Sequence, residues 1–247
     1  MPKKIEGENS TSFRMIPGGK ITLVKKSQEG VRETLNLEPF YLSETPVTNQ
    51  QYVDFLNQAL SSIRLENGHV IHEDKTWLRL GEVIRGYKPI VFREGQFHIK
   101  EAMHAACPVI RVTGYGARAY ADHFGMQLAT DAQWLLAVMH STTDAEIQQS
   151  PSSVGTERLQ LPIPSPVMLY KPNKYGIRGL NRNFGEWGLS GKDEEQKEEE
   201  GEYVVLGGLK DYSQTNVLNP SVIWRNPEKS YADVGFRTVL PEKPVNE

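Results

Sequence analysis

The sequence predicts an irregular, loop-rich α+β domain with two main helices and short antiparallel strands. Apolar residues recur at helical spacing in only a few segments, whereas most other apolar runs are a few residues long and end at turn dipeptides. Prolines recur between residues 151 and 172, which excludes long regular elements there. We therefore expect one domain in which loops connect short elements.

The N-terminal region combines strand patterns with one helix. Residues 14–23 and 35–42 have strand character, and the second segment alternates apolar and polar residues. Thr48 is a candidate N-cap for the helix that follows. The apolar stripe of this helix is assigned to the core and consists of Tyr52, Val53, Phe55, Leu56 and Leu60.

We expect the domain to span residues 14–241 and to follow a flexible N-terminal segment, residues 1–13. Residues 61–105 are interpreted as inserted loops and small strands, with turns at glycine-containing dipeptides. Four histidines fall in this insertion: His69, His72, His98 and His104. Their spacing has no matching carboxylate, so solvated or structural histidines are favoured over a zinc site.

The pattern is clearer from residue 108 onward. Residues 109–112 form a predicted buried strand, and residues 115–124 a helix that ends at Gly125. Thr130 and Gln133 have the spacing of a capping box, which indicates the start of another helix.

Two further features belong to the C-terminal part. Residues 191–202 are rich in glutamate and are expected to form a solvated acidic loop, because blocks of like charge repel one another. Residues 203–208 and 234–240 are the last predicted strands.

Composition narrows the possible partners and compartment. The net charge is −3, which argues against nucleic acid as the main partner. No apolar run approaches the roughly 18 residues that a membrane helix needs, and no signal-peptide core is visible. Cys107 is the one cysteine, so a reducing compartment such as the cytoplasm is expected. Its apolar neighbours favour a buried structural thiol over a reactive one.

Four sequence blocks occur in an order typical of one family. MIPGG (15–19), PFYL (39–42) and PVTNQQYVDF (46–55) make up the first block, and PVIRV (108–112) leads to GMQLATDAQW (125–134) in the second. The third joins PNKYGI (172–177) to NFGEW (183–187), and the fourth pairs Gly207-Gly208 with GFR (235–237). Together they resemble the formylglycine-generating enzyme (sulfatase-modifying factor) family. The resemblance implies a C-type-lectin-like fold.

The sequence differs from the active members of this family at the positions of their copper-binding cysteines. Active members have two copper-binding cysteines after the second glycine, whereas residues 209–217 here contain none, and Tyr212 and Val217 fall at the matching places. Hydroxyl and aliphatic groups are poor substitutes for thiolates at Cu(I). We therefore expect no formylglycine-generating oxidase activity, no catalytic residues of that kind and no cofactor.

The resemblance also implies a calcium site that this sequence has altered. Glu186 aligns with a calcium carboxylate, and Asn183 lies in the same loop. However, Gly179 replaces an expected oxygen ligand and Arg182 replaces a glycine. Because a guanidinium repels Ca²⁺, an Arg182–Glu186 ion pair is preferred, with a calcium remnant at Glu186 and Asn183 as the alternative.

We expect a non-catalytic binding or scaffold module that recognises a protein or small ligand through the former active-site face, and not nucleic acid or a membrane. The candidate contact residues are Tyr212, Asn216, Asn219, Trp224, Arg225 and Tyr231. Trp224 could equally be a core residue, whereas Trp134 and Trp187 are expected in the core. The alternative function is a metal-dependent (iron or copper) oxidoreductase of different chemistry, with an iron site built from His69, His72 and His98.

Overall fold

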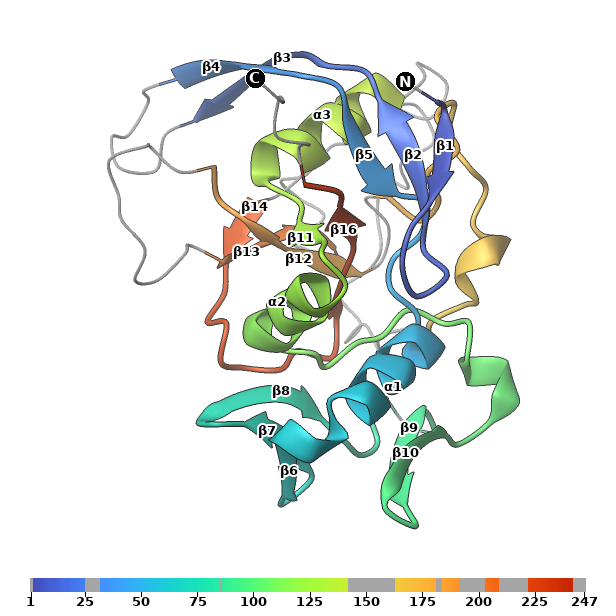
Figure 1. Cartoon of the computed structure of the whole chain (residues 1–247). Coiled ribbons are helices and arrows are strands. Elements are labelled where there is room, and N and C mark those ends of the chain that lie inside the picture. The colour runs from blue at the N-terminus through green and yellow to red at the C-terminus, as the bar shows by residue number, and fades with distance from the viewer. Residues whose placement is uncertain are drawn as a thin grey trace, which may run out of the picture.

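A computed structural model describes residues 2–24, 32–84, 86–141, 163–180, 184–191, 203–208 and 222–241. Several residues discussed above lie outside this set: Arg182, Asn183, Tyr212, Asn216, Val217, Asn219 and the acidic stretch 192–202. The predicted α+β class is confirmed (Figure 1). The fold-class prediction named two main helices, whereas the described residues contain three, one at each of the helix positions indicated by the sequence.

A five-stranded sheet combines strands from the N-terminal and C-terminal parts of the sequence. Its order is β1-β2-β5-β16-β11, and its strands are Lys4–Glu6 (β1), Ser12–Ile16 (β2), Phe40–Ser43 (β5), Thr238–Val239 (β16) and Gln127–Leu128 (β11). Ile5 pairs with Phe13 across β1 and β2, and Phe13 is fully buried. The sheet therefore includes part of residues 1–13, which we had predicted to be a flexible segment outside the domain.

The predicted strand at 35–42 is two strands in different sheets. β3 (Gly19–Val24) and β4 (Arg32–Leu37) form a separate two-stranded ribbon over α3, and β5 joins the five-stranded sheet. Pro39 separates β4 from β5. Proline lacks a backbone N–H, so it allows the chain to leave one sheet and enter another.

The helices begin where local capping signals place them. Helix α1 (Asn49–Gln58) starts after Thr48, whose side chain accepts from the Gln51 N–H in a complete capping box. Helix α2 (Gly114–His123) is capped by Thr113 and is followed by Gly125 in the left-handed region, with φ +64°. Helix α3 (Asp131–Ser141) follows Thr130, whose Oγ1 accepts from the Gln133 N–H at 3.1 Å.

Residues 61–105, which we predicted to be inserted loops and strands, form two small antiparallel units at the end of the molecule opposite β3 and β4 (Figure 1). β6 (Ile63–Glu66), β7 (His69–His72) and β8 (Lys75–Arg79) make one, and β9 (Ile90–Arg93) and β10 (Gln96–Ile99) make the other. Asn67-Gly68 and Glu94-Gly95 turn these hairpins with both residues at positive φ. Short 3-10 turns occur at Leu60–Ser62, Ala102–His104 and Val167–Leu169.

A second, four-stranded sheet carries the C-terminal blocks. Its order is β14-β13-β12-β15, with β12 (Gly185–Leu189), β13 (Tyr203–Gly207), β14 (Val222–Trp224) and β15 (Val234–Phe236). β12 and β15 run parallel, so Trp187 pairs with Phe236 at the centre of the molecule. Both side chains are fully buried.

The predicted strand at 109–112 was wrong. The segment is buried, but its pairing among the described residues is limited to single bridges at Pro108 and Val112. Arg111 interrupts it with φ +61°, a conformation that no regular strand contains. Four members of the predicted helical stripe, Tyr52, Val53, Phe55 and Leu56, are buried on α1, whereas Leu60 lies in the following 3-10 turn and is only partly buried.

Candidate functional site

Glu186 is the buried carboxylate at the centre of the family motifs. It lies on β12, and Arg237 follows β15, the parallel neighbour of that strand. Arg237 donates from Nε to Oε2 at 2.7 Å and from Nη2 to Oε1 at 2.8 Å. Trp134 of α3 donates from Nε1 to Oε2 at 2.8 Å. Three N–H groups thus occupy both oxygens of a carboxylate that is only 4% exposed.

This geometry changes the expectation for Glu186. The predicted partner, Arg182, lies outside the described residues, and the partner that the structure describes is Arg237. Across the described ranges, no group of three or more His, Cys, Asp or Glu side chains is placed to hold a metal ion. The arrangement at Glu186 is that of a structural ion pair, in which the charge is neutralised and both oxygens accept from protein N–H groups.

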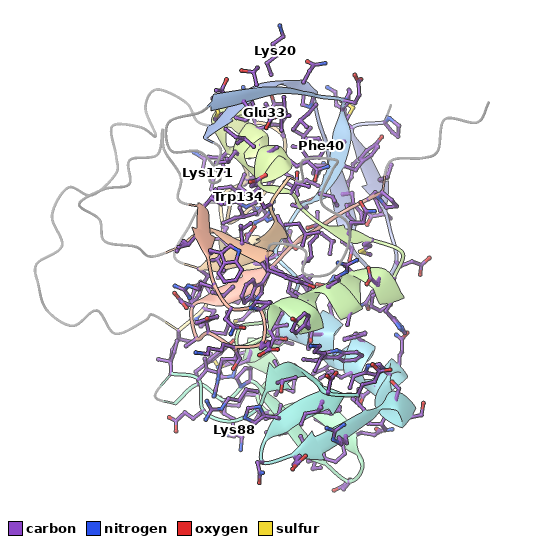
Figure 2. The ribbon with its side chains drawn as sticks, turned by 90° about the vertical axis from the view of Figure 1, so that its left-hand side faces the viewer. Lys20, Glu33, Phe40, Lys88, Trp134 and Lys171 are labelled. Carbon is purple, nitrogen blue, oxygen red and sulfur yellow. The ribbon has the colours of Figure 1, made fainter. Side chains whose placement is uncertain are left out.

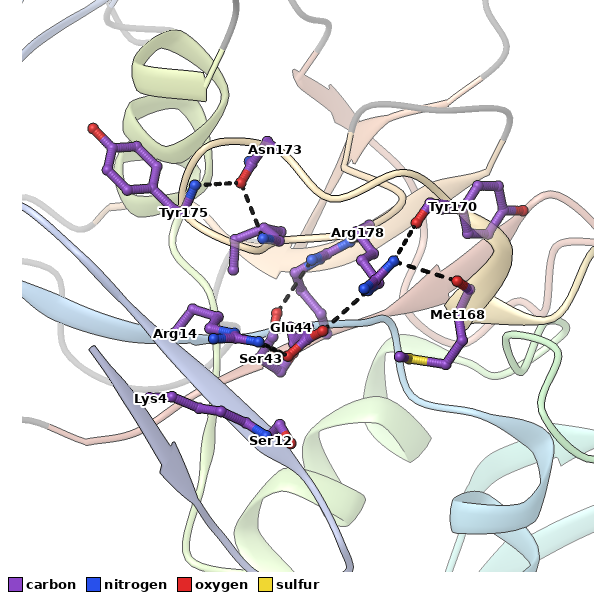
Figure 3. Close-up of polar contacts among 12 residues, drawn as sticks. Lys4, Ser12, Arg14, Ser43, Glu44, Met168, Tyr170, Asn173, Tyr175 and Arg178 are labelled. Carbon is purple, nitrogen blue, oxygen red and sulfur yellow. Dashed lines mark hydrogen bonds and ion pairs between the residues drawn. The ribbon is translucent and has the colours of Figure 1, made fainter. Parts of the chain in front are cut away.

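A second ion network continues from the first. Glu44 accepts from Arg14 Nε at 2.9 Å and from Arg178 Nε at 3.0 Å, and it lies between the two arginines in Figure 3. The Arg178 carbonyl accepts from Arg237 Nη2 at 3.1 Å, which links the two networks. These contacts hold the loop of the third motif against β5.

The asparagine of that motif, Asn173, organises its own loop. Its Oδ1 accepts from the backbone N–H groups of Tyr175 at 2.9 Å and Ile177 at 3.0 Å (Figure 3). Gly179, which replaces an expected calcium ligand, adopts φ +68° beside the Tyr170 ring. The motif residues described in this loop therefore serve its conformation.

A small cavity lies beside Glu186 and is almost entirely apolar. Pro46, Pro108, Tyr170 and Phe236 contribute to its lining, and Glu186 is the one charged side chain among its described lining residues. Because the Glu186 carboxylate is already bonded to Arg237 and Trp134, the cavity offers no free charged group to a polar ligand.

Three of the six residues predicted to bind a partner are described by the structure: Trp224, Arg225 and Tyr231. Trp224 ends β14, an edge strand among the described strands, and is 57% exposed. Arg225 donates to both oxygens of Asp233, at 2.7 and 2.9 Å, and its guanidinium lies 4.6 Å from the Tyr231 ring centroid. Bonding to Asp233 raises the pKa of Arg225. The structure thus favours the surface alternative for Trp224 and confirms that Trp134 and Trp187 are core residues.

The histidines do not assemble into the proposed iron site. His69 and His72 lie on β7 and His98 on β10, in separate sheets. His72 stacks on Trp77 with ring centroids 4.8 Å apart, and His104 is buried against Tyr87. Cys107 is buried as predicted, and its thiol donates to the Pro164 carbonyl at 3.1 Å. Burial raises the pKa of the Cys107 thiol, which disfavours the reactive thiolate.

Two structural features were not predicted from the sequence. Arg237 was quoted in the GFR motif but was not paired with Glu186, although a buried glutamate requires a cation and this arginine is in the neighbouring motif. Arg111 was assigned to a strand, and no local sequence signal indicates its positive φ.

The family comparison agrees with this fold and motif order. The chain belongs to the sulfatase-modifying factor enzyme 1-like domain family, whose model matches residues 2–241. It is 30% identical over 188 residues to proteins named serine/threonine-protein kinase pkn1 from Chlamydia pneumoniae and Chlamydia caviae. Each alignment covers 72% of this chain and 27% of the relative, so the chain spans about a quarter of these relatives.

Solved structures support the fold alone. CarF matches with a TM-score of 0.56 and 16% identity, covering 95% of this chain and all of CarF. PvdO from Pseudomonas aeruginosa gives 0.57 at 14% identity, covering 97% of this chain and 98% of PvdO. Treponema denticola variable protein 1 gives 0.56 at 16% identity, with coverages of 97% and 99%. Within the described part of the chain, no helix is long and apolar enough to cross a membrane.

Proposed function

We propose that this chain is a non-catalytic binding or scaffold module that recognises a protein or small ligand through the face formed by Trp224, Arg225 and Tyr231. The observation that carries this proposal is the exposure of Trp224. The other three tryptophans are buried, whereas Trp224 is 57% exposed and directly precedes Arg225, whose guanidinium lies over the Tyr231 ring. Tryptophan, tyrosine and arginine are the residues most enriched at interface hot spots.

Contacts within the chain hold Arg225 and Tyr231, two of the three residues of this face. The bidentate Arg225–Asp233 pair fixes the loop from β14 to β15, and the Tyr231 carbonyl accepts from the Arg111 N–H at 3.0 Å. A preorganised surface loses less side-chain entropy on binding than a mobile one. This rigidity supports recognition by the loop.

The contacts of Glu186 support a role without a resident metal or cofactor. Both oxygens are committed to Arg237 and Trp134, so Ca²⁺ would first have to displace a buried guanidinium. The stretch 209–217 also lacks the thiols that the family oxidases need. We therefore favour a binding role over oxidoreductase chemistry. We place the protein in a reducing compartment such as the cytoplasm because Cys107 is its one cysteine.

The named relatives support a module that works within or beside a larger protein. The chain matches only 27% of proteins named as serine/threonine kinases, so a related domain is built into longer chains there. By analogy, we propose that this domain supplies recognition to a larger assembly.

Site-specific photo-crosslinking tests the proposed face. A photoreactive residue at Lys229, in the loop between β14 and β15, should give a discrete adduct with a partner protein in the source cells. The same residue at Leu65, exposed on β6, should not. The adduct should disappear when Trp224→Ala is added. Equal labelling from both positions, or labelling that survives Trp224→Ala, would contradict the proposal. For a small ligand, native mass spectrometry compares binding to the unmodified chain with binding to Trp224→Ala.

A further inference from the structure

Arg111 occupies a backbone conformation that favours glycine. Its φ is +61°, and its neighbours Ile110 and Val112 are both buried. The other described non-glycine residues with positive φ all lie in turns between consecutive paired strands: Asn9, Ser10, Asn67, Glu73 and Glu94. A non-glycine residue in the left-handed region costs free energy. The arginine side chain therefore stands where glycine would be the less strained choice.

The backbone of Arg111 connects two parts of the surface. Its N–H donates to the Tyr231 carbonyl at 3.0 Å, and its carbonyl accepts from the Arg79 N–H at 3.2 Å. Its Nη1 donates to the Glu82 carbonyl at 2.9 Å. The backbones of Arg79 and Arg111 are thus held next to the loop of residues 225–233, which follows Trp224 at the end of β14.

These two arginines have no carboxylate partner among the residues that the structure describes. Arg225 is paired with Asp233, and Lys75 lies 3.9 Å from Glu228. By contrast, burial lowers the pKa of Arg111, and the nearby charge on Arg79 lowers it further. Repulsion between the two cations lowers the stability of the folded chain, so the fold by itself does not favour this arrangement.

The region is positive on a chain that is negative as a whole. The charged side chains that the contacts of Arg111 and Tyr231 bring together include Arg79, Arg111 and Arg225, and the carboxylate that forms an ion pair with one of them is Asp233. The whole chain has a net charge of −3. A local positive region on an acidic protein attracts anionic groups and raises their rate of association.

We propose that Arg79 and Arg111 bind the carboxylates of an acidic peptide segment in a partner protein, with an apolar residue of that segment packed on Trp224. This inference rests on the proposed face and specifies its ligand class. Guanidinium groups bind carboxylates through charge-assisted, often bidentate hydrogen bonds. An exposed indole supplies apolar contact area beside them. The strain at Arg111 is then a structural cost that is retained because the side chain is needed for binding.

The test uses the full chain and two synthetic, fluorescently labelled peptides. One has a central tryptophan flanked by four glutamates on each side, and in the other glutamine replaces every glutamate. Fluorescence anisotropy at low salt should show at least tenfold tighter binding of the glutamate peptide. Arg79→Gln and Arg111→Gly should each weaken that binding about fivefold or more, and Arg111→Lys should weaken it less. Lys20→Gln is the matched control, because Lys20 lies on β3 at the far end of the molecule (Figure 2), and it should leave binding unchanged.

Arg111→Gly keeps the fold testable, because glycine adopts φ +61° without strain. Equal binding of the two peptides, or binding unaffected by Arg79→Gln and Arg111→Gly, would overturn the inference. A single-stranded oligonucleotide of eight phosphates that binds more tightly than the glutamate peptide would also overturn it. These results are separable from the proposed function: a Trp224-dependent crosslink with no preference for the glutamate peptide rejects the acidic ligand and leaves the face intact.

Discussion

Arg237 donates to both carboxylate oxygens of Glu186, at 2.7 and 2.8 Å, and both side chains are almost completely buried. The pair joins β12 to the residue after β15 and, through Trp134, ties both to α3. Two family motifs that are far apart in the sequence therefore meet in one interaction. Both charges are buried, so removal of either side chain would leave the other charge in the interior without a counter-charge.

Glu186→Gln should destabilise the protein by about 3–5 kcal/mol, because it leaves the Arg237 guanidinium buried without a counter-charge. Urea denaturation followed by far-UV circular dichroism measures this loss. Glu66→Gln is the control, since Glu66 is exposed and lies 3.7 Å from Arg64, and it should cost less than about 1 kcal/mol. Similar losses for both variants would contradict the structural role of the buried pair.

Calcium should leave the thermal stability unchanged. A ligand that binds only the native state increases the free energy of unfolding, by about 2.7 kcal/mol at a hundredfold excess over Kd. The melting temperature rises as a result. The Glu186 oxygens are occupied, so we expect no shift between chelator-treated protein and protein in millimolar Ca²⁺. Differential scanning fluorimetry, with Mg²⁺ as the control ion, makes the comparison. A rise of several degrees specific to Ca²⁺ would restore the calcium alternative.

Alkaline pH should destabilise the fold through Tyr120. Burial raises the pKa of Tyr120 from its ordinary value of 10.0 to about 12. Between these values the unfolded chain loses the phenol proton and the folded chain keeps it, so the free energy of unfolding falls as pH rises. One such group contributes about 1.4 kcal/mol of loss between pH 8 and 11. Urea denaturation at both pH values measures this loss of unfolding free energy, and Tyr120→Phe should make the loss smaller. An equal loss in both proteins would exclude Tyr120 as the cause.

The parts of the fold that sequence reasoning predicted are those decided by local contacts. The Thr48–Gln51 and Thr130–Gln133 capping boxes place two helix starts within four residues of sequence. The family motifs then supplied the overall fold class. Hairpin turns such as Asn67-Gly68 were readable for the same local reason.

The parts that were missed depend on contacts between distant segments. The Glu186–Arg237 pair spans 51 residues and requires the parallel pairing of β12 with β15, which no local pattern encodes. The positive φ of Arg111 depends on partners in β8 and in the Tyr231 loop. Trp224 could not be assigned from its sequence, since exposure depends on its place at a sheet edge. Tyr212, Asn216 and Asn219 stay predictions, because they lie outside the described residues.

Trp224 should contribute little to the stability of the fold, and its fluorescence should be the most accessible to a quencher in solution. Trp77, Trp134 and Trp187 are buried, so acrylamide should quench mainly the fluorescence of Trp224. Trp224→Ala should remove most of the accessible fraction and change the free energy of unfolding by less than about 0.5 kcal/mol, as is usual for surface substitutions. Trp187→Ala should instead cost about 3–5 kcal/mol, because it empties a core site and leaves the Val112 carbonyl without its 3.0 Å bond. Stern–Volmer plots and urea denaturation provide the two measurements. A large stability loss in Trp224→Ala would mean that the indole serves the fold, and the case for this surface as a recognition face would fail.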